Sequence, residues 1–147
     1  MKETSENLSK EKLNLLKEAG YSEKAIKLYS DRVNVGVIEN PDVTLIYEGH
    51  CGDSIKLYLK IQGDLIEDAK FQYLGCPGSA ACGSTMIQLV KDKTLSEAKQ
   101  ITKKDILAEL NGLPGDESHC AELAVTTLQR TVMKYEESQK VIGEESS

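Results

Sequence analysis

Tryptophan is absent from this sequence of 147 residues, and phenylalanine occurs only once. Acidic residues outnumber basic ones by 24 to 18, which gives a formal net charge of −6. A nucleic-acid groove needs clustered basic side chains, often interleaved with aromatic rings on which bases stack. These two shortages predict that nucleic acid is not a partner of this protein.

Cysteine is sparse, with four in the chain, whereas disulfide-stapled domains usually exceed about 8–10%. No stretch approaches the ~18 successive apolar residues of a membrane span, and residues 1–7 lack the basic-then-apolar order of a secretory signal. We therefore expect a soluble, cytoplasmic protein with no membrane contact. In such a reducing compartment, cysteines more often bind metal or do chemistry than form disulfides.

The rest of the composition is ordinary for a globular protein, with 39% hydrophobic and 29% charged residues. The length suits one domain. We expect a partly helical N-terminal extension over residues 1–20, a single domain over residues 21–137, and a flexible C-terminal tail over residues 138–147.

The pattern of apolar residues predicts two short helices, then three strands, then four helices. Alternation of apolar and polar residues predicts strands at 54–61 and 68–73, and β-branched and aromatic residues predict a third strand at 43–48. Their short connections favour an antiparallel meander. This order indicates an α+β domain with a small three-stranded antiparallel sheet and helices packed on one face.

Residues that can cap helices support the helical assignments. Serine or threonine stands ahead of four expected helices, at Ser9, Ser22, Thr94 and Thr102. Another helix should begin after Gly75, with Pro77 in its first turn. The last helix has an apolar face from Cys120 to Tyr135.

Three cysteines stand where these elements meet. Cys51 lies between the first two strands, Cys76 between the third strand and a helix, and Cys120 at the start of the last helix. The chain's two histidines, His50 and His119, directly precede two of them. Thiolates and imidazoles are ligands that iron and zinc accept, and a helix start favours the thiolate. The spacing contains no CxxC pair, so burial as small apolar residues is the alternative reading.

The segments around these cysteines form a recognisable set. They read Cys51-Gly52-Asp53, then Gly75-Cys76-x-x-Ser79, then His119-Cys120 following Leu113-Pro114. In this order they resemble the motifs of the IscU/NifU-type iron–sulfur cluster assembly scaffolds, and the resemblance covers roughly residues 21 to 136.

The resemblance implies a non-enzymatic scaffold. A cysteine desulfurase would supply sulfur, iron would join it, and a [2Fe-2S] cluster would be passed to recipient apoproteins. The implied ligands are Cys51, Cys76 and Cys120, which should meet in one coordination sphere, with Asp53 or His119 as the fourth. Zinc suits the same donors and can occupy the site of the isolated protein.

Two other functions remain open at this point. One is a zinc-containing, SufU-like acceptor of persulfide sulfur, although proteins of that type usually lack a histidine at the position of His119. The other is a structural zinc domain, which predicts unfolding when the metal is removed.

Three features depart from the family pattern or stand outside it. The chaperone-docking segment of the family, Leu-Pro-Pro-Val-Lys, is replaced here by residues 113–117, Leu-Pro-Gly-Asp-Glu. The reversed charge argues against an Hsp70-type chaperone partner. Cys82 occupies a position where the family has serine or alanine, and we expect a small buried residue there; the alternative is a spare thiol that accepts sulfur or pairs with Cys76. His50 is expected to face solvent.

Overall fold

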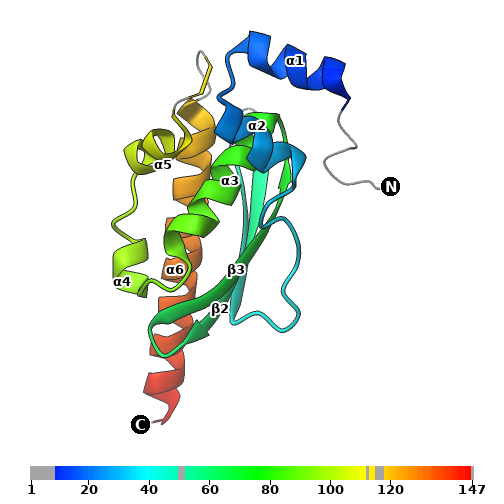
Figure 1. Cartoon of the computed structure of the whole chain (residues 1–147). Coiled ribbons are helices and arrows are strands. Elements are labelled where there is room, and N and C mark those ends of the chain that lie inside the picture. The colour runs from blue at the N-terminus through cyan, green and yellow to red at the C-terminus, as the bar shows by residue number, and fades with distance from the viewer. Residues whose placement is uncertain (1–8, 50–51, 112, 115–117, 147) are drawn as a thin grey trace.

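The computed structural model describes residues 9–49, 52–111, 113–114 and 118–146 (Figure 1). The elements follow the expected order: α1 (Lys10–Ala19), α2 (Glu23–Ser30), β1 (Val43–Glu48), β2 (Ser54–Gln62), β3 (Leu65–Leu74), α3 (Pro77–Val90), α4 (Leu95–Ala98), α5 (Lys103–Leu110) and α6 (Ser118–Ser146). The α+β class predicted from the sequence is confirmed.

The three strands form one antiparallel sheet in the order β1-β2-β3, as the short connections indicated. On one face, Leu57 pairs with Leu45 of β1 and with Phe71 of β3. Leu57 and Phe71 are completely buried. The opposite face carries polar residues such as Lys56 and Gln72, which are paired in the same register. One face of the sheet therefore belongs to the core.

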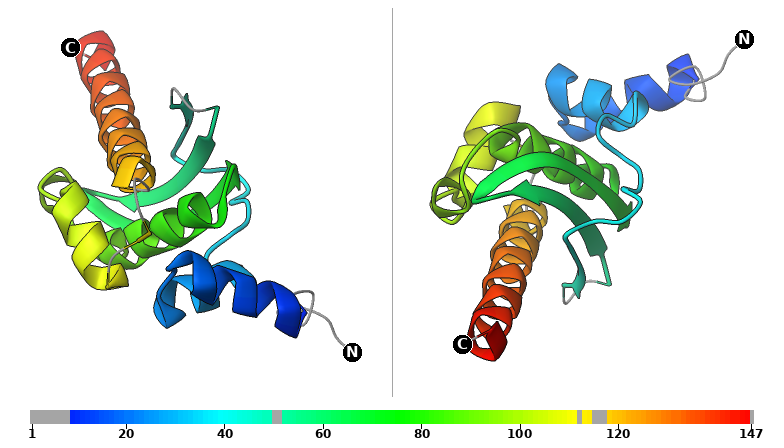
Figure 2. Two further views of the ribbon diagram at one scale, coloured as in Figure 1. Left: turned by 90° about the horizontal axis from the view of Figure 1, so that it is seen from above. Right: turned by 90° about the horizontal axis from the view of Figure 1, so that it is seen from below.

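Helices α3 and α6 pack against the sheet and against each other, α6 over β1 and β2 and α3 mainly over β3. Helix α3 is central, because α2, α5 and α6 also contact it. Gly83 permits its close approach to β3, since a Cβ there would lie 2.4 Å from Cε2 of Phe71. Figure 2 shows α1 lying apart from the sheet, beyond α2.

The predicted helix caps are confirmed. The side chains of Ser9, Ser22, Thr94 and Thr102 each accept a hydrogen bond from a backbone N–H in the first turn of the helix that follows. At α4 and α5 the bond is reciprocated by Glu97 or Asp105, which completes a capping box. Each of these helix starts is stabilised by neighbours in the sequence.

The last helix is longer than the apolar pattern indicated. It runs through Ser146, into residues 138–147, which we expected to form a tail. Near that point Lys99 contacts Glu136 at 2.8 Å, and Lys134 donates to the carbonyl of Thr44 at 2.7 Å. These contacts attach α6 to α4 and β1, and the helix continues beyond them. Flexibility of residues 138–147 stays a prediction.

Within the part of the chain that the structure describes, no helix combines the length and apolar character needed to span a membrane.

Candidate metal centre

Three side chains from separate elements meet at one end of the sheet. Asp53 lies just before β2, Cys76 is the N-cap residue of α3, and Cys120 lies in the first turn of α6. Their potential ligand atoms all lie within 4.8 Å of one another. The sulfurs of Cys76 and Cys120 are 3.6 Å apart, and Oδ2 of Asp53 is 3.9 Å from the sulfur of Cys76. Two thiols and a carboxylate therefore converge.

The residue before Cys76 is what lets the carboxylate approach. Gly75 has φ +150°, and a Cβ there would lie 2.7 Å from Cγ of Asp53. A side chain would be strained by this backbone and would also occupy the space of the carboxyl group. The loop that carries Asp53 is closed by a 2.8 Å hydrogen bond from the N–H of Gly49 to the carbonyl of Asp53. The backbone therefore fixes both Asp53 and the segment before Cys76 that it approaches.

Ser79 joins the three side chains from one turn further along α3. It is completely buried, and its hydroxyl donates to Oδ2 of Asp53 at 2.7 Å. The same oxygen lies 3.7 Å from the sulfur of Cys120 and 3.8 Å from that of Cys76. Ser79 had no role among the site residues predicted from the sequence. The available signal was its spacing of three residues from Cys76, which places both on one face of a helix.

The electrostatics of the sulfur pair differ from the sequence-based expectation. The hydrogen bond with Cys76, burial and the charge of Cys76 raise the pKa of Cys120, and Ser79 opposes the shift. We expected the helix start to lower it. The shared hydrogen bond and the loss of solvent both favour the protonated thiol, and two adjoining thiols do not readily both ionise without a compensating cation. A bound divalent metal would supply that charge.

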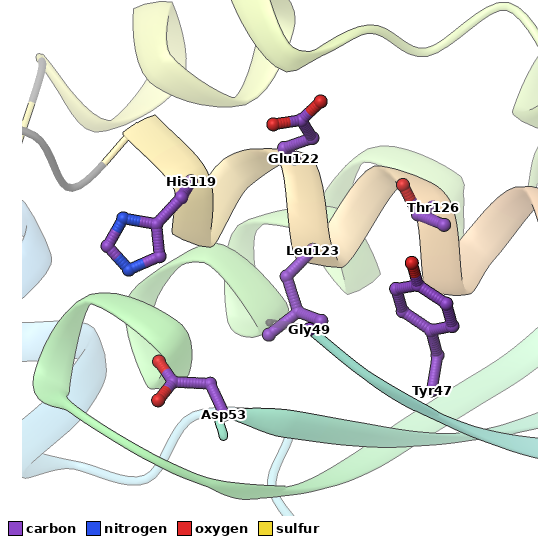
Figure 3. Close-up of a pocket in the computed structure, with 7 residues that line it drawn as sticks. All are labelled: Tyr47, Gly49, Asp53, His119, Glu122, Leu123 and Thr126. Atoms are coloured by element: carbon purple, nitrogen blue, oxygen red, sulfur yellow. The ribbon is translucent and has the colours of Figure 1, made fainter. Parts of the chain in front are cut away.

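His119 lies beside this group and outside it. Its Nε2 is 3.7 Å from the sulfur of Cys120, but it is not among the residues whose ligand atoms lie mutually within 4.8 Å. It lines a pocket of about 100 Å³ with Tyr47, Gly49, Asp53, Glu122, Leu123 and Thr126. Figure 3 shows the imidazole and the Asp53 carboxylate at one end of this pocket, and Tyr47 and Thr126 at the other. Asp53 thus borders both the sulfurs and the pocket.

Other predicted residues have different outcomes. Cys51 and His50 lie outside the described residues, as do residues 115–117 of the docking segment. The expected burial of Cys82 is confirmed, because this side chain is completely buried in α3. Cys82 and Cys120 belong to the same buried cluster, and Cys82 is the smallest of the causes that raise the pKa of Cys120.

The protein is a small α+β domain in which two thiols and a carboxylate meet at the ends of strands and the starts of helices. Such a group of ligands defines a class of proteins that can hold a soft metal ion or an iron–sulfur cluster. Residues 20–141 of this chain match the NifU-like N terminal domain, and the chain belongs to that family.

Similar proteins are found among bacteria and archaea. The chain is 37% identical over 116 residues to the iron-sulfur cluster assembly scaffold protein IscU 1 of Archaeoglobus fulgidus, covering 78% of this chain and 76% of that protein. It is 37% identical over 120 residues to IscU of Escherichia coli strain K12, covering 78% of this chain and 93% of that protein. A crystal structure of a candidate SUF-system scaffold, FiSufU from Fervidobacterium islandicum AW-1, superposes with a TM-score of 0.62 at 26% identity, covering 76% of this chain and 96% of that one.

Proposed function

We propose that this protein is a scaffold on which a [2Fe-2S] cluster is assembled and from which it is passed to recipient apoproteins. Iron and the sulfur delivered by a cysteine desulfurase are its substrates, and the scaffold catalyses no reaction of its own. The observation that carries the proposal is the pair of sulfurs from Cys76 and Cys120, 3.6 Å apart with Asp53 beside them. The names of the similar IscU proteins support it. We expect this work to take place in the cytoplasm.

The proposed ligands are Cys51, Cys76 and Cys120, with Asp53 or His119 as the fourth. Thiolates suit iron–sulfur clusters and bind them firmly. A carboxylate is a harder donor and holds such a cluster less tightly. This mixture is useful in a scaffold, which must release its cargo. The position of Asp53 next to the sulfurs supports it over His119 for the fourth place.

The size of the core argues against a purely structural zinc domain. The buried apolar cluster extends from β1 through the sheet to α3, α5 and α6, and it reaches the candidate site only at Cys120 and Cys76. Such a core should hold the fold without metal, whereas structural zinc domains unfold when it is removed. Circular dichroism before and after treatment with a chelator tests this point; loss of secondary structure would favour the structural role.

A zinc-holding acceptor of persulfide sulfur is the second candidate. It is supported by the grouping of Asp53 with Cys76 and Cys120 while His119 lies to one side, and by the similarity to FiSufU. In this case zinc would hold the cysteines until sulfur arrives.

Anaerobic reconstitution with ferrous iron and sulfide separates these functions. The full chain should develop the visible absorption of an iron–sulfur cluster and bind iron and sulfide in equal amounts. Cys76→Ser should lose most of this absorption, whereas Cys82→Ser, a matched change in the same helix, should keep it. Zinc binding without cluster formation would favour the sulfur acceptor. An equal yield from Cys76→Ser would contradict the proposed site.

A further inference from the structure

The carboxyl group of Asp53 has two possible neighbours for its oxygens. Ser79 and the sulfurs lie on one side, and the pocket that contains His119 lies on the other. We propose that Ser79 is a positioning residue, whose hydrogen bond selects Asp53 rather than His119 as the fourth ligand of the metal. This inference rests on the proposed function, because it assumes that the cysteines hold metal.

The contact between Ser79 and Asp53 has the properties of a strong bond. Its length is 2.7 Å, within the short range expected when a hydroxyl donates to a carboxylate. Ser79 is completely shielded from solvent, so water cannot replace Asp53 as its partner without a change in packing. A buried hydroxyl that loses its partner is left without a hydrogen bond, which is unfavourable because water cannot replace it. The bond therefore restrains the carboxyl group.

The restraint acts in a definite direction. Ser79 lies within 4 Å of both sulfurs, so an oxygen of Asp53 bonded to Ser79 is held beside them as well. The backbone of Gly75 leaves just enough room for the carboxyl group on this side. One oxygen of Asp53 is thus engaged by Ser79, and this bond holds the carboxylate beside the sulfurs although Asp53 also lines the pocket.

His119 competes with Asp53 to bind the metal, and the bond between Ser79 and Asp53 disfavours it. It precedes Cys120 in the chain, and its Nε2 already lies 3.7 Å from that sulfur. Imidazole is a good ligand for zinc and iron. Without the hydroxyl of Ser79, Asp53 could turn into the pocket that it shares with His119, and the imidazole could take the vacated place. Ser79→Ala should therefore exchange a carboxylate ligand for an imidazole ligand.

The test is nitrogen-15 NMR of the imidazole groups in the full chain, recorded with and without zinc. The chain has two histidines, so a His50→Gln background leaves His119 as the single imidazole. In this background His119 should show no zinc-induced ligation shift. Ser79→Ala should produce that shift, and Asp53→Ala should produce it too, as the reference for a site without the carboxylate.

Two further variants separate positioning from packing. Ser84→Ala is the matched control, because Ser84 is also completely buried in α3 and its hydroxyl has no hydrogen-bond partner within the described residues. It should leave His119 unligated. Ser79→Thr keeps the hydroxyl and should behave as the background does. If Ser79→Ala does not fold, comparison of Ser79→Val with Ser79→Thr serves in its place, because the two side chains have nearly the same shape and only threonine carries a hydroxyl.

The possible outcomes are distinct. Ligation of His119 before any change at Ser79, or zinc-loaded Ser79→Ala with His119 still unligated, would overturn the inference and leave the proposed function standing. Absence of zinc binding by the unmodified chain in a chelator competition would overturn the inference alone, whereas failure of that chain to form a cluster on reconstitution with iron and sulfide would overturn the proposed function. Ligation of His119 in Ser79→Ala but not in Ser84→Ala supports the role of Ser79.

Discussion

The two helices that follow α3 in the chain begin in a different way from α3 itself. At α4 and α5 a threonine side chain caps the helix and an acidic residue returns the bond. At α3 the N-cap residue is Cys76, whose side chain makes no capping hydrogen bond. Its sulfur lies instead near Cys120, Ser79 and Asp53.

The difference shows where stability has been given up for chemistry. A serine or threonine cap is worth roughly 0.5–2 kcal/mol to a helix, and α3 has the extended N-cap backbone that such a residue needs, with φ −84° and ψ 171°. A thiol in this position cannot cap well, but it can bind a soft metal. Local rules of helix formation are therefore broken at the site that carries the proposed function.

The largest effects on metal binding and on stability should come from replacing a glycine by alanine. The two glycines are Gly75, just before α3, and Gly83, inside α3. Gly75→Ala places a Cβ 2.7 Å from Cγ of Asp53, so it should displace the carboxylate and lower zinc affinity by roughly 10–100-fold. Gly83→Ala places a Cβ against the ring of Phe71 and should instead lower the free energy of unfolding by about 1–3 kcal/mol.

Each variant is the control for the other, because Gly75→Ala should change zinc affinity and Gly83→Ala should change stability. Urea unfolding without metal measures stability, and competition with a chelator measures zinc affinity in the folded protein. Unchanged zinc affinity in Gly75→Ala would show that the close approach of Asp53 is unimportant for binding.

The next effect is on the pH dependence of metal binding. The hydrogen bond with Cys76 and burial raise the pKa of Cys120, so this thiol keeps its proton at neutral pH and the metal must displace it. The apparent zinc affinity should therefore fall as pH falls, by about tenfold per pH unit for that one proton. Chelator competition between about pH 6 and pH 8 measures the slope.

Thr94→Ala should leave this slope unchanged, because Thr94 caps α4 and belongs to the other kind of helix start. A flat profile in the unmodified chain would mean that Cys120 is already a thiolate before metal arrives.

Sequence patterns predicted the parts of the molecule that depend on neighbours in the chain. Alternation located the strands, and Thr94 and Thr102 located helix starts, because these signals act over a few residues. They could not predict the contact of Lys134 in α6 with Thr44 in β1, because these residues lie far apart in the sequence.

For the site, the sequence predicted which residues take part but not how they are arranged. Motifs and family resemblance identified Asp53, Cys76 and Cys120 as candidates, and the structure brings these three together. Spacing could not show that Ser79 bridges them or that His119 lies to one side, because both depend on how α3 and α6 pack. The direction of the pKa shift of Cys120 was wrong for the same reason, since the neighbouring sulfur comes from another helix.

The smallest effect tests the comparison of helix starts directly. Cys76→Ser puts a good capping residue on the N-cap backbone of α3 and should stabilise the metal-free protein by roughly 0.5–1 kcal/mol, although it removes a proposed ligand. Thr94→Ala removes a cap and should destabilise the protein by about 1 kcal/mol. Urea unfolding in the presence of a chelator measures both.

Cys82→Ser is the control, because Cys82 lies inside α3, where no cap is needed, and burying its new hydroxyl should bring no gain. If Cys76→Ser proved less stable than the unmodified chain, the packing of the Cys76 sulfur against Cys120 and Ser79 would outweigh a cap, and the cysteine would stabilise the fold as well as serve the site.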